Sequence, residues 1–280
     1  MARSQDQALA TATGMIKGPL RYWRTLKRFW GSALASQMEY QINLLIEVLA
    51  MAGNLAGSLL LLWLIYGRGQ QLGGWSLDAA LVVLGIYTLL DGVSSTLLRP
   101  NLGAIVTQVQ QGTLDFVLLK PIDSQFWLSS RTISPWGLPE IVTGLALALW
   151  AALRAGARPG LATILGGGLM LLSSVVILYS LWFVLATTSI WFVKTWNVTE
   201  VLRAALSAGR YPISAYPAGL RTLFTVVLPV AFLTTVPAEA ILGRAACSWL
   251  ALSVAVAAGS LLFSRWFWRL ALRDYTSASS

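Results

Sequence analysis

The chain has 280 residues, of which 56% are hydrophobic and only 11% are charged, a composition that excludes an ordinary soluble domain and indicates several passages through a membrane. The formal net charge is +9, but the basic residues are spread along the chain rather than gathered in one stripe, so we expect no nucleic-acid partner. Histidine is absent and Cys247 is the single cysteine, so we expect neither a metal site nor an internal disulfide.

The N-terminal region is predicted to have two parts. Residues 1–14 are small and polar and are typical of a disordered tail. Within 15–40 we expect an amphipathic interfacial helix, because placing residues at 100° per step separates an aromatic and aliphatic arc from a basic one. A basic helix with tryptophans on its apolar face lies flat on an anionic membrane surface. The same helix could also brace a cytoplasmic partner.

Six apolar segments are predicted to cross the membrane within a transmembrane domain at 41–273, followed by a C-terminal tail at 274–280. The predicted spans are about 41–66, 77–98, 136–153, 161–193, 220–236 and 245–263. Arg99 and Pro100 are expected to end the second span. These six spans predict a polytopic, all-α membrane protein.

The region after the fourth span contains two irregular pieces. A short amphipathic helix that ends at Gly209 is expected to lie on the inner membrane surface. The fifth span is expected to be kinked at Pro229 and to break at Pro237. The residues that follow, with Glu239, are expected to form a short re-entrant or interfacial piece.

The charge distribution predicts the orientation. With the N-terminus inside, 16 of the 20 Lys and Arg residues fall in segments that face the cytoplasm. Because cytoplasmic loops carry an excess of Lys and Arg, both termini are predicted to be cytoplasmic. The expected location is an inner membrane of the bacterial type.

The longest loop between spans contains the segment 112–123, with the sequence Gly-Thr-Leu-Asp-Phe-Val-Leu-Leu-Lys-Pro-Ile-Asp. Thr113 is expected to N-cap a short helix with Asp115 in its first turn and Lys120 in its last. Asp123 or the serine after it is expected to cap the next helix. Any capped helix at a membrane surface would have this pattern, so these features leave open whether the segment binds a partner.

The order of several short motifs resembles the ABC-2 type permeases, which are the membrane subunits of a class of ATP-driven exporters. The segment 112–121 resembles their Gly-Thr-Leu-Glu…Leu-Leu…Pro motif, with Asp115 in place of the usual glutamate. Similarity to the subfamily of viologen and multidrug exporters continues in Gly-Arg-Tyr-Pro at 209–212, Leu-Pro-Val-Ala-Phe at 228–232, Val-Pro-Ala at 236–238 and Tyr-Thr-Ser-Ala-Ser-Ser at 275–280.

The resemblance implies a fold, partners and site residues. The fold would be the six-helix ABC-2 type, with a cytoplasmic coupling helix between spans 2 and 3 and a re-entrant piece between spans 5 and 6 that carries Pro237 and Glu239. The partners would be two cytoplasmic ABC ATPase subunits, a second permease chain that is identical or related, and membrane lipids. The residues expected to contact an ATPase are Thr113, Leu114, Asp115, Phe116 and Lys120.

The resemblance also places the nucleotide chemistry outside this chain. The sequence contains no ATP-binding motif, so we expect no enzymatic activity and no cofactor here. ATP and magnesium would be bound by the partner subunits.

Four polar residues lie inside predicted spans: Glu47, Asn54, Asp91 and Glu140. Such residues are costly in lipid and should face protein or water. They could line a translocation path or a subunit interface. Alternatively, Glu47 and Glu140 could reach the basic inner surface, and Asn54 and Asp91 could form ordinary interhelical hydrogen bonds.

The predicted function is therefore export of an amphipathic, drug-like or lipid-linked molecule along a path between two permease chains. An integral membrane enzyme acting on lipids is an alternative, although the lack of histidine and of an acidic cluster argues against it. A secondary transporter is another alternative, for which internal repeats would be expected. The sequence contains no convincing repeat.

Overall fold

The computed structural model describes residues 22–23, 25–27, 29–32, 41–158, 160–192 and 196–275. The predicted tail at 1–14 lies outside these residues. The helices are α3 (Gln41–Gly67), α4 (Leu77–Val93), η1 (Ser94–Leu98), α5 (Arg99–Gln110), α6 (Asp115–Leu118), α7 (Ser124–Ser130), η2 (Pro135–Gly137), α8 (Leu138–Arg154), α9 (Leu161–Thr187), η3 (Thr188–Ile190), α10 (Trp196–Ser207), η4 (Ala208–Arg210), η5 (Ile213–Ala215), α11 (Ala218–Thr222), η6 (Leu223–Val227), α12 (Val230–Leu233), α13 (Thr235–Ile241) and α14 (Cys247–Asp274).

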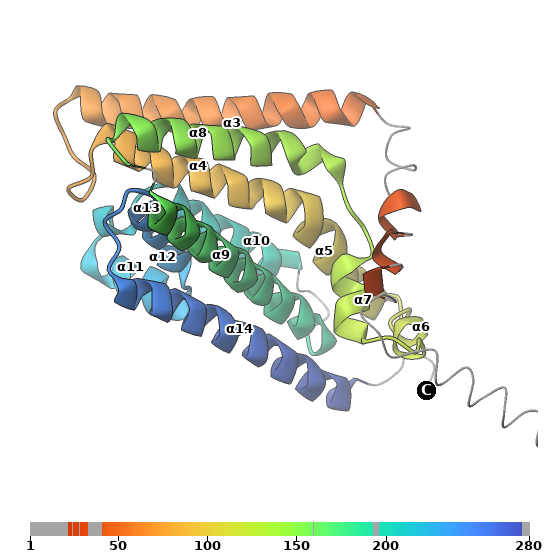
Figure 1. Cartoon of the computed structure of the whole chain (residues 1–280). Coiled ribbons are helices and arrows are strands. Elements are labelled where there is room, and N and C mark those ends of the chain that lie inside the picture. The colour runs from red at the N-terminus through yellow and green to blue at the C-terminus, as the bar shows by residue number, and fades with distance from the viewer. Residues whose placement is uncertain are drawn as a thin grey trace, which may run out of the picture.

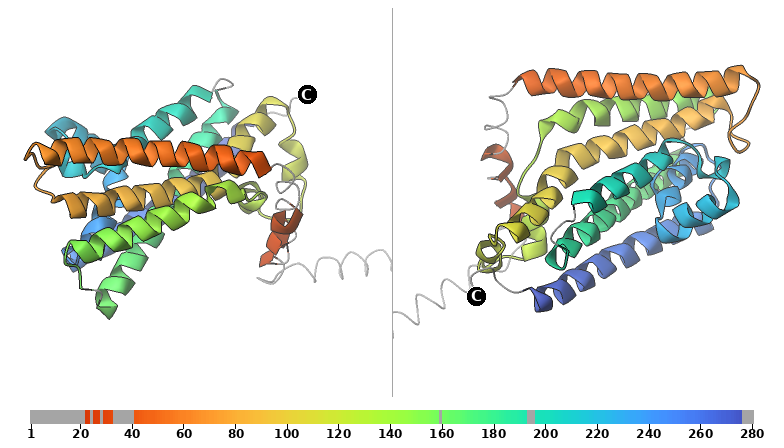
Figure 2. Two further views of the ribbon diagram at one scale, coloured as in Figure 1. Left: turned by 90° about the horizontal axis from the view of Figure 1, so that it is seen from above. Right: turned by 180° about the vertical axis from the view of Figure 1, so that it is seen from behind.

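Five helical segments of the described residues are long and apolar enough to cross a membrane. They are Leu45–Gly67, Leu77–Gln110, Pro135–Arg154, Leu161–Ile190 and Cys247–Asp274. Figures 1 and 2 show them extending between the same two ends of the molecule. We call the end with the α3–α4 connection the loop end and the end with α6 and α7 the α6 end. Helices α3, α8 and α9 lie within a few residues of predicted spans, whereas α14 continues well beyond residue 263.

The sequence predicted that the second long helix ends at Pro100, but the helix continues past this residue. Helix α4 passes through the wider π turn η1 into α5, and Pro100 lies in the first turn of α5. Proline has no N–H for the carbonyl four residues earlier, but that carbonyl, on Thr96, accepts a hydrogen bond of 2.9 Å from the backbone N–H of Ser134. Because the freed carbonyl is satisfied by another segment, the helix continues to Gln110.

Helices α4 and α8 pack through glycines. A Cβ atom on Gly85 of α4 would lie 2.5 Å from the backbone nitrogen of Ala148, and one on Gly144 of α8 would lie 2.3 Å from the backbone nitrogen of Leu89. No side chain fits at such distances, so the two backbones are in direct contact. Small residues allow this close approach, which stabilises helix pairs in membranes through van der Waals contact.

The other long helices differ in how much surface they bury. Half of the most apolar 18-residue stretch of α9 is buried, because this helix packs against α14, α12 and α13. In addition, the hydroxyl of Ser174 on α9 donates a 2.9 Å hydrogen bond to the carbonyl of Phe232. Helix α3 lies at the edge of the bundle (Figure 1). Only 11% of its most apolar 18-residue stretch is buried. Its outward face is available to lipid or to another chain.

The amphipathic helix α10 does not lie on a membrane surface. It packs beside α9, and its Leu202 is only 2% exposed. The following residues run along α4 toward the loop end, where the hydroxyl of Ser214 donates a 3.3 Å hydrogen bond to the carbonyl of Gly73. The described part of its apolar face, with Leu202 and Leu206, packs into the bundle. The side chains of 196–201 lie outside the description.

The predicted fifth span at 220–236 has a different geometry. Segments Ala218–Val227 and Val230–Ile241 meet at a bend of 69°. Figure 1 shows α11, α12 and α13 together at the loop end, so this bent pair forms the re-entrant part of the fold. The passage from the α6 end toward the loop end is made earlier, by α10 and η4. Strong apolar character here reflects burial against α9 as well as contact with lipid.

The two prolines of the bent pair behave differently. Pro229 lies at the bend, as predicted, between the extended Leu228 and α12. Pro237 was predicted to break a helix, but it lies in the first turn of α13. Backbone N–H groups in a first turn have no partner within the helix, so proline is tolerated there.

Candidate functional site

The segment 112–123 forms a sharp turn and a single helical turn at the α6 end. Gly112 adopts a φ of +67°, which ends α5 and reverses the chain. The expected N-cap role of Thr113 is wrong, because the hydroxyl of Thr113 donates back to the carbonyl of Gln108 and no side chain caps α6. The segment is therefore held by α5 rather than by its own cap.

Helix α6 presents one apolar surface inward and another outward. Leu114 is fully buried and Val117 is 5% exposed, whereas Phe116 is 68% exposed and Leu119 is 81% exposed. Of the residues predicted to contact an ATPase, Phe116 is thus available to a partner and Leu114 is not. Leu119, which the sequence analysis did not single out, has the largest exposed fraction among the large apolar side chains of the segment.

Two of the three charged residues of the segment, Asp115 and Lys120, contact neighbouring elements. The Nζ atom of Lys120 lies 3.9 Å from the ring centroid of Trp127 on α7, a cation–π contact. Burial and the nearby charge of Asp115 raise the pKa of the Tyr275 phenol, which places the C-terminal end of α14 beside α6. Asp115 and Lys120 therefore tie α6 to the rest of the α6 end.

Helix α7 joins α6 to the bundle. Asp123 caps it, as predicted, by accepting a 2.9 Å hydrogen bond from the N–H of Phe126, and it accepts another of 2.7 Å from Arg265 of α14. Burial alone would raise the pKa of Asp123, but these hydrogen bonds hold it below its usual value. Gln125 donates to the hydroxyl of Tyr179 on α9 at 3.1 Å. A displacement of α7 must therefore act on both α9 and α14.

The described part of the predicted interfacial helix packs against α7. Tyr22 meets Phe126 at a ring-centroid distance of 4.8 Å, and Phe29 meets Trp127 at 4.7 Å, both edge to face. The remaining residues of 15–40 before α3, including most of its basic arc, lie outside the described residues. The aromatic face thus braces α7, in addition to any contact with lipid.

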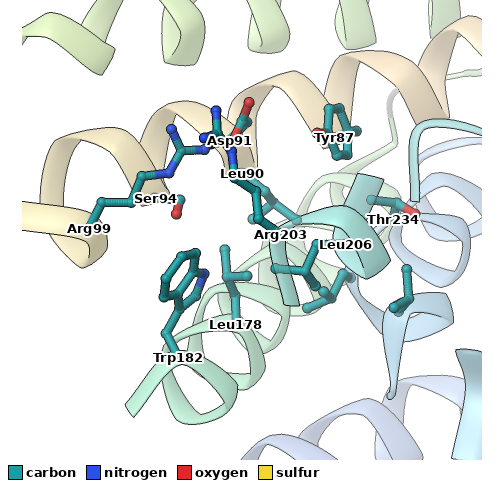
Figure 3. Close-up of a pocket in the computed structure, with 12 residues that line it drawn as sticks. Tyr87, Leu90, Asp91, Ser94, Arg99, Leu178, Trp182, Arg203, Leu206 and Thr234 are labelled. Atoms are coloured by element: carbon teal, nitrogen blue, oxygen red, sulfur yellow. Dashed lines mark hydrogen bonds and ion pairs between the residues drawn. The ribbon is translucent and has the colours of Figure 1, made fainter. Parts of the chain in front are cut away.

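A charged pocket with an enclosed volume of about 30 Å³ lies inside the bundle, between α4, α9, α10 and α12. Asp91 and Arg99, separated by two helical turns, form an ion pair at its edge, and Arg203 of α10 reaches toward Asp91 from the other side (Figure 3). The pocket is lined by Tyr87, Leu90, Asp91, Ser94, Arg99, Leu178, Trp182, Arg203, Leu206, Val230, Leu233 and Thr234. Polar groups therefore lie on one side of a mostly apolar wall.

An adjoining pocket with an enclosed volume of about 30 Å³ shares Tyr87 and Asp91 with the charged pocket. It contains Asn54 and Glu140, so three of the four polar residues predicted inside spans come together. Glu140 accepts a 3.0 Å hydrogen bond from Ser95. Glu47 is exposed and lines neither pocket.

The arginines of these pockets are what the sequence analysis missed. Arg99, Arg203 and Arg210 were counted as basic residues of inner loops, but all three line one of the two pockets. The guanidinium of Arg210 lies 5.0 Å from the ring centroid of Tyr87, and it donates to Ser58 at 3.5 Å. The spacing of two helical turns between Asp91 and Arg99 could have indicated their ion pair from the sequence. No local pattern indicates the positions of Arg203 and Arg210.

The residues predicted for the outer re-entrant piece lie in α13 at the loop end. Pro237 is buried and Glu239 is partly buried. The carbonyl of Glu239 accepts a 2.8 Å hydrogen bond from the N–H of Arg244, which closes the turn before α14. Both residues lie at the end opposite α6.

Comparison with known proteins identifies the family. A family model described as "ABC-2 family transporter protein" matches residues 52–279, a range that includes the segment 112–123, the bent pair and the lining of both pockets except Met51. A search of curated proteins and a search of solved structures found no match. Members of this family are multi-pass membrane subunits that associate with ABC ATPases. Because the match covers most of the chain, this protein belongs to the ABC-2 family of transporter proteins.

Proposed function

We propose that this chain is the permease subunit of an ATP-driven exporter. It binds separate cytoplasmic ATPase subunits through α6 and forms, with a second permease chain that is identical or related, the path for an amphipathic, drug-like or lipid-linked substrate. The observation that carries this proposal is the pair of exposed apolar side chains, Phe116 and Leu119, on a one-turn helix that is tied to several long helices. Exposed apolar groups beyond a membrane span favour burial in a partner protein.

The connections of α6 are suited to transmit movement. On one side α6 follows α5, which is continuous with α4, and on the other side it leads into α7, which is bonded to α9 and α14. A partner that shifts α6 would therefore act on three long helices at once. Nucleotide binding and release on the partner would then favour alternate arrangements of the path.

The α6 end faces the cytoplasm in this proposal, in an inner membrane of the bacterial type. The distribution of basic residues supports this orientation. The structure lowers the number of Lys and Arg residues in cytoplasmic loops, because Arg221 lies on α11 at the loop end and three other arginines lie in the pockets. The basic excess remains with the termini and the loops at the α6 end. ATP and magnesium are bound by the partner, and this chain hydrolyses no ATP.

An apolar pocket supports an amphipathic substrate. It has a volume of about 410 Å³ and lies between α4, α8, α9 and α13 near the loop end. Its lining includes Leu145, Leu149 and Ile164, which are largely exposed and therefore reach the lipid-facing surface. A hydrocarbon chain or an apolar ring system fits such surroundings.

Substitutions on α6 test the coupling role. Phe116→Asp and Leu119→Asp should each reduce capture of the cognate ATPase by the purified permease by at least about tenfold, because each places a charge in an apolar contact. Charge reversal of Asp115 or Lys120 should have a smaller effect, because both residues also contact this chain. The matched control is Phe192→Asp, since Phe192 is 66% exposed at the same end but lies outside α6.

Transport in inverted vesicles completes the test. Export should require ATP and persist when ion gradients are collapsed. Unchanged ATPase capture and unchanged transport in both α6 variants would remove this segment from the coupling role. Transport that follows an ion gradient without ATP would contradict the proposed function itself.

A further inference from the structure

The charged pocket contains polar groups that nothing in the described structure satisfies. Ser94 Oγ, Trp182 Nε1, Thr234 Oγ1 and the Nε atom of Arg99 are buried without a hydrogen-bond partner. The residues Ser94, Trp182 and Thr234 are only 4%, 5% and 2% exposed. Buried polar groups in proteins are almost always paired. Four unpaired groups around one cavity therefore indicate that the cavity receives something.

The chemistry of these groups limits what the cavity can receive. An indole N–H and a guanidinium N–H can only donate hydrogen bonds, and the two hydroxyls can donate as well as accept. The occupant must therefore supply acceptors that reach both Trp182 of α9 and Arg99 of α5. Oxygen atoms of a phosphate or carboxylate meet this requirement from a single compact group.

The charge of the pocket favours an anion. Asp91 is its single acidic residue, whereas Arg99 and Arg203 are both basic, so the lining carries one net positive charge. Glu140 lies in the adjoining pocket, where it accepts a hydrogen bond from Ser95, and Arg210 lies there with it. The two pockets together therefore remain positive, and charge interactions are strong where water is scarce.

The remaining walls of the pocket are apolar. Leu178 and Leu206 lie across the pocket from Asp91 and Ser94 (Figure 3), and Leu233 also lines it. An inorganic ion would leave these side chains without a partner, whereas an amphiphile would place its headgroup on the donors and its apolar part on the leucines. The enclosed space of about 30 Å³ is that of a water molecule, so it takes the oxygen atoms of the headgroup while the apolar part of the amphiphile extends toward the open side of the pocket.

We propose that the charged pocket binds the anionic oxygen headgroup of an amphiphile, through donors from η1, α5, α9 and the α12–α13 junction. The headgroup could belong to an exported substrate or to an acidic membrane lipid, and the same donors would recognise both. That the amphiphile is transported rests on the proposed function. That it binds does not.

The binding test uses the full chain purified in a neutral maltoside detergent, without an ATPase. The probes are dodecyl phosphate, a short-chain phosphatidylglycerol, dodecyltrimethylammonium and inorganic phosphate, with binding measured by native mass spectrometry. Both anionic amphiphiles should bind at least about tenfold more tightly than the cation of equal chain length. Inorganic phosphate should bind much more weakly than either, because it makes no apolar contact.

Conservative variants locate the site. Trp182→Phe removes only the indole N–H, and Thr234→Val and Ser94→Ala remove only hydroxyls, so each should weaken binding of dodecyl phosphate by about three- to tenfold. Trp127→Phe and Ser253→Ala are matched controls, because those residues also carry unpaired buried groups but lie outside the pocket. Melting temperatures of all variants show that each is folded.

Two results would overturn the proposal. One is binding of the cation as tightly as the anions, and the other is unchanged binding of dodecyl phosphate in all three pocket variants, which would mean that water alone fills the cavity. If the two-chain lipid binds tighter than dodecyl phosphate, the headgroup is that of a lipid; the reverse order indicates a single-chain substrate. Because no ATPase is present, these results are independent of the coupling test on α6.

Discussion

The two faces of α4 are built in opposite ways. Toward α8, Gly85 and Gly92 bring the backbones into contact and leave no space for a single added carbon. On the opposite face, Tyr87, Asp91 and Ser94 border two pockets and include an ion pair and an unpaired hydroxyl. One helix thus joins a rigid pair to an adaptable polar cavity. The contrast suits a transporter, because a rigid unit can move as a whole while the cavity beside it changes shape.

The largest effect is expected from disturbing the glycine contact. Gly144→Ala places a Cβ atom against the backbone of Leu89, which cannot move away without shifting α4. We expect a loss of about 3 kcal/mol in the free energy of unfolding and a clear drop in melting temperature in detergent. Gly259→Ala on α14 is the control, because nothing lies within 4 Å of the added atom.

The control should be neutral or gain about 0.5 kcal/mol, since alanine favours a helix. Equal melting temperatures for the two variants would show that α4 and α8 do not form a rigid pair.

An intermediate effect is expected on the polar face. Asp91→Asn removes the partner of Arg99, and Arg99→Gln removes the partner of Asp91, so each leaves a charge only about a quarter exposed and poorly compensated. The double variant should be more stable than the sum of the single effects predicts, with a coupling energy of about 1–2 kcal/mol. Melting temperatures of the three variants measure this coupling. Additive effects would mean that Asp91 and Arg99 do not stabilise each other.

The smallest effect is expected for an ion pair at the water-exposed α6 end, which sharpens the contrast with the pair in the bundle. Asp123→Asn retains an N-cap for α7 but loses the charged contact with Arg265, whose side chain is 45% exposed. The loss should be no more than about 1 kcal/mol at pH 7 and should decrease in high salt.

The effect of Asp123 should also depend on pH. Because the folded state lowers the pKa of Asp123, its contribution is present above the unfolded pKa of about 3.9 and is lost as the pH falls through the lower folded value. The difference in melting temperature between wild type and Asp123→Asn should therefore shrink below about pH 4. A difference that persists there would point to the shape of the side chain rather than its charge.

Local signals were read correctly where the interaction partners are close in sequence. Long apolar runs located α3, α8 and α9, Asp123 caps the helix that begins at the next residue, and Pro229 lies at a bend. The errors arose where a distant segment decides the outcome. Pro100 does not end a helix because Ser134 satisfies the carbonyl that it frees, and the second half of the run at 220–236, from Val230 on, is buried against α9.

The candidate sites divide along the same line. A carboxylate inside an apolar run is conspicuous in sequence, so Asp91 and Glu140 could be singled out. The arginines that face them could not, because Arg203 and Arg210 follow them by many residues and are brought near by the passage of α10 along α4. The short helix α6 was predicted from the sequence, but Leu114, which was expected to contact a partner, is buried, and Leu119 is exposed instead.

The sequence by itself determined that this chain crosses a membrane several times, that it resembles ABC-2 permeases and that its segment 112–123 lies between the second and third spans. Composition and periodicity suffice for these conclusions, because the cost of placing polar groups in lipid is paid residue by residue along the chain. Only the tertiary structure decided which polar groups meet and which remain unpaired. Those outcomes depend on which helices become neighbours, and a charged pocket exists only where several of them converge.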